Sequence, residues 1–173
     1  GASVALIGAF AEHPRFQGSG SSLVNPVTVT TARQAFTDAG IDVRYAPGYD
    51  PVLSGLEPSL IDDAVAVAAE ADVVVLMAGL PGVYESEGFD RPDLHLPQQQ
   101  ERLIAALTAA NSRTVVALSN GGPTVMPWLD GVAAVVESYL GGQASGGARV
   151  DVLYGDVDPG GRLAETFPQQ QSE

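Results

Sequence analysis

The sequence predicts an α/β domain built on a doubly wound, mostly parallel sheet of about five to six strands flanked by helices. Two observations lead to this prediction. Short apolar runs alternate with stretches of helical periodicity along most of the 173-residue chain. Among them, residues 72–78 (DVVVLMA) form a nearly continuous apolar run, as expected for a central strand that helices cover on both faces.

The first half of the chain predicts two strands and two helices. Residues 3–7 (SVALI) and 41–45 (IDVRY) are typical of short strands. A helix is expected between them over 28–39, closed by Gly40, because glycine readily takes the left-handed conformation that ends many helices. Apolar residues at helical spacing predict a second helix over 59–71.

The second half continues the alternation. Pro97 suits the first turn of a helix, which is expected to run to Asn111. Strands are predicted over 114–119 and 132–138. A flexible glycine-rich turn over 141–147 and a short helix over 148–154 complete the order.

No linker or internal repeat interrupts this order. Residues 1–168 are therefore expected to form one α/β-sandwich domain, and 169–173 a tail. In a parallel sheet, ligands bind at the loops that follow the carboxyl ends of the strands. Five loops are expected at such positions: 9–25, 46–58, 79–97, 120–127 and 139–147.

The composition argues against several partners and cofactors. The chain has 21 acidic and 8 basic residues, a net charge of −13, which repels nucleic acid and anionic membrane surfaces. With no cysteine and only 2 histidines, neither a metal site nor any other cofactor is predicted. No apolar run approaches the roughly 20 residues that span a bilayer. The start, GASVALIGAF, predicts a strand rather than a signal peptide and favours a cytoplasmic location, with the true amino terminus expected upstream.

Two common catalytic patterns are absent from the sequence. The glycine-rich stretch 18–22 (GSGSS) is followed by Leu23, where a dinucleotide fingerprint needs its third glycine, and the chain has no lysine for a phosphate loop. No GxSxG motif is present, which argues against a serine hydrolase of the common type. These absences leave the carboxylates as candidates.

The most unusual stretch is the charged loop 84–97 (YESEGFDRPDLHLP). Glycoside hydrolysis needs two carboxyl groups, and Glu85 and Glu87 lie two residues apart, so in an extended chain they would point the same way. Asp90 beside Arg91 is expected to stay ionised and to suit hydrogen bonding. From chemistry alone, a solvated charged loop and acid/base catalysis both remain open.

Four separated motifs resemble one family. They are the charged loop, residues 14–26 (PRFQGSGSSLVNP), residues 99–128 (QQERLIAALTAANSRTVVALSNGGPTVMPW) and residues 138–168 (SYLGGQASGGARVDVLYGDVDPGGRLAETFP). Together they resemble the second, α/β-sandwich domain of glycoside hydrolase family 3, the family of β-glucosidases and β-xylosidases.

The resemblance implies a role for named residues. In many members the acid/base is the glutamate before a Gly-aromatic-Asp-Arg sequence, which corresponds to Glu87, with Glu85 as the rival. Glu85, Asp90 and Arg91 are expected to contact the substrate. Ser21 and Ser22 resemble the family's glycine/serine loop near the domain interface and are expected to contact the substrate as well.

The resemblance also implies a partner domain. Family members carry the nucleophilic aspartate on a (β/α)-barrel, which takes around 250 residues. The chain is therefore expected to be one domain of a retaining β-glucosidase-like enzyme that acts on a β-glucoside or related sugar, and to be inactive when isolated. A non-catalytic carbohydrate-binding or domain-assembly module is the alternative, and a flavodoxin-like regulatory domain is a third possibility.

Overall fold

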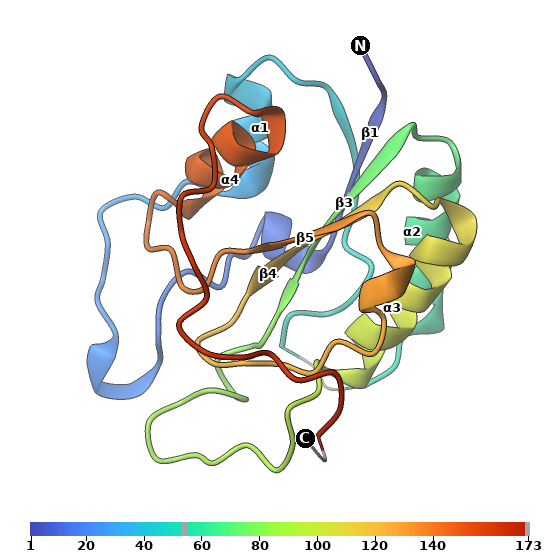
Figure 1. Cartoon of the computed structure of the whole chain (residues 1–173). Helices are drawn as coiled ribbons and strands as arrows, with labels where there is room; N and C mark the ends of the chain where they lie inside the picture. The colour runs from blue at the N-terminus through green and yellow to red at the C-terminus, as the bar shows by residue number, and fades with distance from the viewer. Residues whose placement is uncertain (53–54, 172–173) are drawn as a thin grey trace.

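The computed structural model describes residues 1–52 and 55–171, and its centre is a parallel sheet with helices on both faces (Figure 1). Within these residues the sheet has 5 strands, all paired in parallel, in the order β2-β1-β3-β4-β5. The strands are β1 Val4–Ile7, β2 Val43–Ala46, β3 Val73–Gly79, β4 Thr114–Ser119 and β5 Ala134–Glu137. The predicted α/β class and the parallel sheet are confirmed.

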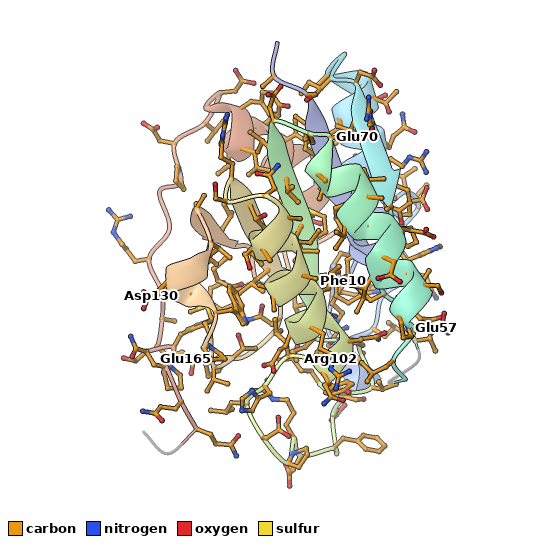
Figure 2. All side chains as sticks on the ribbon, turned by 90° about the vertical axis from the view of Figure 1, so that its right-hand side faces the viewer. Phe10, Glu57, Glu70, Arg102, Asp130 and Glu165 are labelled. Carbon is orange, nitrogen blue, oxygen red and sulfur yellow. The ribbon has the colours of Figure 1, made fainter. Side chains whose placement is uncertain are left out.

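Two pairs of helices cover the sheet. Helices α1 Ala32–Asp38 and α4 Ser145–Tyr154 pack together on one face, and α2 Pro58–Ala69 and α3 Gln98–Ala110 on the other (Figure 1). Figure 2 shows α2 and α3 side by side in front of the sheet, with Glu57 and Glu70 at opposite ends of α2. No helix in the described part of the chain combines the length and apolarity that a membrane crossing requires.

The core lies between the sheet and these helices. The side chains of the central strands β1, β3 and β4 are almost all buried, because both faces of the sheet are covered. Leu6, Leu76 and Leu118 have no exposed surface. Replacing such a side chain with alanine typically costs about 2–5 kcal/mol, so these apolar runs fix the positions of the strands and of the loops that follow them.

Several predicted boundaries differ by one or two residues, and two helices begin three or four residues away from the predicted start. The first helix begins at Ala32 rather than at 28, because the Thr31 side chain accepts a hydrogen bond from Gln34 N at 3.1 Å and caps the helix there. The last helix begins at Ser145, so residues 145–147 of the predicted glycine-rich turn are helical. Gly146 lies in it without a side chain because a Cβ atom there would lie 2.3 Å from Thr30 O.

The strand order places a topological switch point between β1 and β3. From β1 the chain moves outward to β2, and then crosses back over β1 to β3. Ligands in such sheets bind in the crevice outside the carboxyl ends of the strands at this point. Figure 1 shows the loop after β3 (green) at the edge of the sheet opposite the N-terminus.

Candidate active site

Three loops at the carboxyl edge of the sheet form the candidate site. They follow β1, β3 and β4, and hydrogen bonds join the loop after β3 to each of the other two. The predicted charged loop is the one in the middle. All six predicted site residues lie on the loops after β1 and β3: Ser21, Ser22, Glu85, Glu87, Asp90 and Arg91.

Glu87 lies at the exposed tip of the middle loop and binds the loop after β1. Its Oε2 accepts a hydrogen bond from Ser21 N at 2.7 Å. Gly20 makes this approach possible: its φ is +83°, and a Cβ atom there would lie 2.6 Å from Glu87 Cβ. The glycine-rich stretch therefore provides a backbone that a carboxylate can approach closely.

Hydrogen bonding controls the ionisation of Glu87 in this domain. The Ser21 hydroxyl and the Ser21 backbone N–H stabilise the carboxylate and lower the pKa of Glu87 below its ordinary value. Because the carboxyl group is exposed, burial does little to oppose this effect. Glu87 is therefore ionised at neutral pH.

Glu85 points elsewhere and binds the loop after β4. Its Oε2 accepts from Gly121 N at 2.7 Å and its Oε1 from Gly122 N at 2.9 Å. The expectation that Glu85 and Glu87 point the same way was wrong. The chain does not continue extended past Glu85, since Phe89 N donates to Ser86 O and closes a turn that contains Glu87.

Arg91 anchors the other end of the same loop. Its Nη2 donates to Pro123 O at 2.8 Å, so Glu85 and Arg91 both hold the middle loop against residues 121–123. Asp90 is exposed, and within the described chain no salt bridge joins it to Arg91. Ser22 is exposed too, and its Oγ donates to Ser19 O at 3.4 Å.

A buried polar network supports the loop after β4. Asn120 Nδ2 donates to Gly122 O at 2.9 Å and to Glu137 Oε2 at 3.2 Å. Glu137 Oε1 accepts from Tyr139 N at 2.6 Å, and Tyr139 takes an unusual positive φ of 46°. Burial raises the pKa of Glu137 above its ordinary value. This network holds the two glycines whose N–H groups bind Glu85.

Arg15 is a site residue that the sequence analysis missed. It is only 9% exposed, and its guanidinium bonds the loop after β1 and the segment after β3 together. Burial lowers its pKa, and the nearby Glu85 charge opposes that effect. A single arginine directly before a glycine/serine loop was the available signal.

In the described part of the chain, the side chains at this edge differ from the clusters that hold metal ions. Over residues 1–52 and 55–171, no cluster of three or more histidine, aspartate or glutamate side chains is arranged to hold a metal ion. The site residues offer three carboxylates, two guanidinium groups and the hydroxyl groups of the loop after β1. These groups can exchange a proton and bind hydroxyl groups, as sugar chemistry requires.

Comparison with known proteins agrees with this fold and identifies the family. The model of the glycosyl hydrolase family 3 C-terminal domain matches residues 1–173. A thermostable β-glucosidase B of Acetivibrio thermocellus is 48% identical over 173 residues, 98% of this chain and 23% of the relative. An exo-α-(1→6)-L-arabinopyranosidase of Bifidobacterium longum is 43% identical over 166 residues, 95% of this chain and 22% of the relative.

Solved structures agree as well. The crystal structure of a family 3 β-glucosidase from Bifidobacterium adolescentis matches with a TM-score of 0.94 and 42% identity, over 99% of this chain and 25% of that one. A β-glucosidase from Kluyveromyces marxianus shares the fold, with a TM-score of 0.90 at 18% identity, over 99% of this chain and 39% of that one. The chain belongs to glycosyl hydrolase family 3, as its C-terminal domain, and spans about a quarter of the length of the Acetivibrio thermocellus and Bifidobacterium adolescentis β-glucosidases.

Proposed function

We propose that this domain supplies Glu87 as the acid/base of a retaining β-glucosidase-like enzyme whose nucleophile lies on a (β/α)-barrel domain. In the first step the nucleophile attacks the anomeric carbon, the glycosidic C–O bond breaks, and the leaving oxygen takes the proton of Glu87. In the second step water attacks the anomeric carbon of the glycosyl-enzyme, Glu87 takes a proton of that water, and the bond between the sugar and the nucleophile breaks.

The observation that carries this proposal is the difference in the hydrogen bonds that the Glu85 and Glu87 carboxylates accept. Both oxygens of Glu85 already accept backbone N–H groups, at 2.7 and 2.9 Å, so its carboxylate acts as a loop anchor. Glu87 lies on the exposed tip, and among the described residues Ser21 is the one whose groups stabilise its carboxylate by hydrogen bonding. Of the two, Glu87 is the one with freedom to reach a sugar.

The surface around Glu87 supports a covering domain. Three apolar side chains on this edge are strongly exposed: Val52 at 74%, Val83 at 68% and Phe89 at 71%. They line an open hollow of about 480 Å³ together with Ser19 and Ser86. Clustered apolar exposure of this kind is typical of a surface that packs against another one.

An acid must carry a proton, which Glu87 lacks in the isolated domain at neutral pH. Burial under a second domain and a nearby nucleophilic carboxylate would both raise its pKa, since each disfavours the charged form. The Ser21 N–H then stabilises the carboxylate that forms when the leaving group has been protonated. The same hydrogen bond therefore suits the base needed in the second step.

Glu87→Gln in the complete enzyme tests the proposal. We expect kcat/KM for an alkyl β-glucoside to fall by about 10²–10⁴-fold, and the loss to be far smaller for a dinitrophenyl β-glucoside, whose leaving group needs little protonation. Glu70→Gln, at the opposite edge of the sheet (Figure 2), is the matched control and should change neither value. Unchanged hydrolysis of both glucosides by Glu87→Gln would instead identify a non-catalytic module.

A further inference from the structure

We propose that Arg15 is a positioning residue that fixes the two loops meeting at Glu87, and so determines where this carboxylate lies. The catalytic meaning of this inference rests on the proposed acid/base role of Glu87. The contacts that support it belong to this chain alone.

The guanidinium of Arg15 reaches both loops at once. Nε donates to Leu80 O at 3.2 Å and Nη2 donates to Glu85 O at 3.1 Å, both in the segment after β3. Nη1 donates to Gln17 O and, at 3.2 Å, to Ser19 Oγ in the loop after β1. All three nitrogens are engaged, so one planar group sets the spacing between the two loops.

These contacts lie close in the sequence to the hydrogen bond between Ser21 and Glu87. Ser19 precedes the short turn Gly20–Ser22, whose Ser21 N donates to Glu87 Oε2 at 2.7 Å. Glu85, whose carbonyl Arg15 binds, is two residues before Glu87. Arg15 therefore holds each loop two residues before the point where the loops meet.

Gly82 allows the two loops to approach this closely. A Cβ atom at Gly82 would lie 2.8 Å from Ser19 Oγ and 3.7 Å from Arg15 Nη1. The arginine, the serine and the glycine thus form one packed junction. A side chain at position 82 would push the loop after β1 away from Arg15.

Arg15 is largely buried, and no carboxylate among the residues that the structure describes forms a salt bridge with it. Its residue is 9% exposed, and the Glu85 charge acts on it without direct contact between the two charged groups. Burying a cation without a salt bridge is costly, so stability alone is a poor reason to have an arginine here. The arginine is better explained by the carbonyl and hydroxyl oxygens that surround its rigid, planar guanidinium group. Lysine has one donor nitrogen and cannot reproduce that geometry.

The inference can be tested in the 173-residue chain by NMR. In the wild type, the Ser21 amide resonance should shift as Glu87 titrates, with a pKa below the ordinary glutamate value. In Arg15→Lys we expect the Ser21 amide to stop following Glu87, and the pKa of Glu87 to return towards its ordinary value. Arg33→Lys, an exposed arginine paired with Glu12, is the matched control and should leave both unchanged.

An Arg15→Lys chain that stays folded and keeps the titration of Ser21 unchanged would overturn the inference. If Arg15→Lys does not fold, Ser19→Ala serves instead, because it removes a single contact of Arg15. It should shift the pKa of Glu87 upward by a smaller amount. An unchanged pKa in Ser19→Ala would then contradict the inference.

Kinetics in the complete enzyme separate this inference from the proposed function. A displacement of about 1 Å can cost about 100-fold in rate, so Arg15→Lys should lose about 10–100-fold more on the alkyl than on the dinitrophenyl β-glucoside. Equal losses on both would refute the positioning role, while Glu87→Gln could still show its own leaving-group dependence. If Glu87→Gln shows none, the proposed function fails, whatever Arg15 does to the titration.

Discussion

Glu85 and Glu87 lie two residues apart, yet their carboxylates bind backbone N–H groups of two different loops. Glu85 accepts from Gly121 and Gly122 after β4, and Glu87 accepts from Ser21 after β1. The loop after β3 is thus hydrogen-bonded to the loop after β1 on one side and to the loop after β4 on the other. This division leaves Glu85 as an anchor and Glu87 as the group at the exposed tip.

Ser21→Ala should raise the pKa of Glu87 towards its ordinary value. The Ser21 hydroxyl is the larger cause of the lowered pKa, and alanine removes it while keeping the backbone N–H. A lowered pKa in the folded state stabilises the fold above the ordinary glutamate pKa, and this contribution is lost as pH falls through the lowered value. NMR titration of the Glu87 carboxyl carbon measures the change. Ser22→Ala is the control, and an unaltered pKa in Ser21→Ala would refute the expectation.

Gly20→Ala should displace Glu87, whereas Gly40→Ala should not. Both glycines have positive φ, +83° and +71°, so alanine at either position costs about 1–2 kcal/mol of backbone strain. Only at Gly20 would the new Cβ atom meet Glu87, at 2.6 Å. Urea denaturation should show similar losses of stability for both variants. The titration of Glu87 should change in Gly20→Ala alone, and a change in neither would contradict the proposed close approach.

Gly146→Ala and Gly147→Ala should have opposite effects on stability. At Gly146 a Cβ atom would lie 2.3 Å from Thr30 O, and overpacking of this kind costs about 1–3 kcal/mol. At Gly147 nothing lies within 4 Å, and alanine in a helix is favoured over glycine by about 1 kcal/mol. The free energy of unfolding in urea gives both values. Equal stabilities would show that α4 does not pack against residue 30 as described.

The isolated chain should fold and hydrolyse no β-glucoside. Its proposed partner carboxylate belongs to a barrel domain, and a retaining mechanism needs the two carboxyl groups about 5–5.5 Å apart. Incubation of the purified chain with an aryl β-glucoside, with circular dichroism to confirm folding, measures this. Turnover that Glu87→Gln abolishes would mean that the chain holds its own nucleophile.

The fold could be predicted because its signals are local. The apolar runs at 73–79 and 114–119 exceed what a half-exposed strand carries, and helical spacing separates them. The two larger boundary errors have different causes. The start of α1 depends on a local cap at Thr31, whereas Gly146 lies in α4 at a position where the approach of Thr30 leaves no room for a side chain.

The candidate site was only partly predictable, because contacts between distant segments decide its geometry. Motifs placed the charged loop and the glycine/serine loop at one edge of the sheet. The bond that joins them links Ser21 to Glu87 across 66 residues, and no spacing in the sequence indicates it. The divergent directions of Glu85 and Glu87, and the junction made by Arg15, likewise depend on how distant loops meet.

The most direct test of the acid/base assignment is anion rescue of Glu87→Ala in the complete enzyme. With a dinitrophenyl β-glucoside, the glycosyl-enzyme should accumulate, because no base activates water. Azide needs no base, so it should restore turnover and yield β-glucosyl azide. We expect this product from Glu87→Ala and not from Glu85→Ala. Rescue of Glu85→Ala alone, or of neither variant, would contradict the role of Glu87.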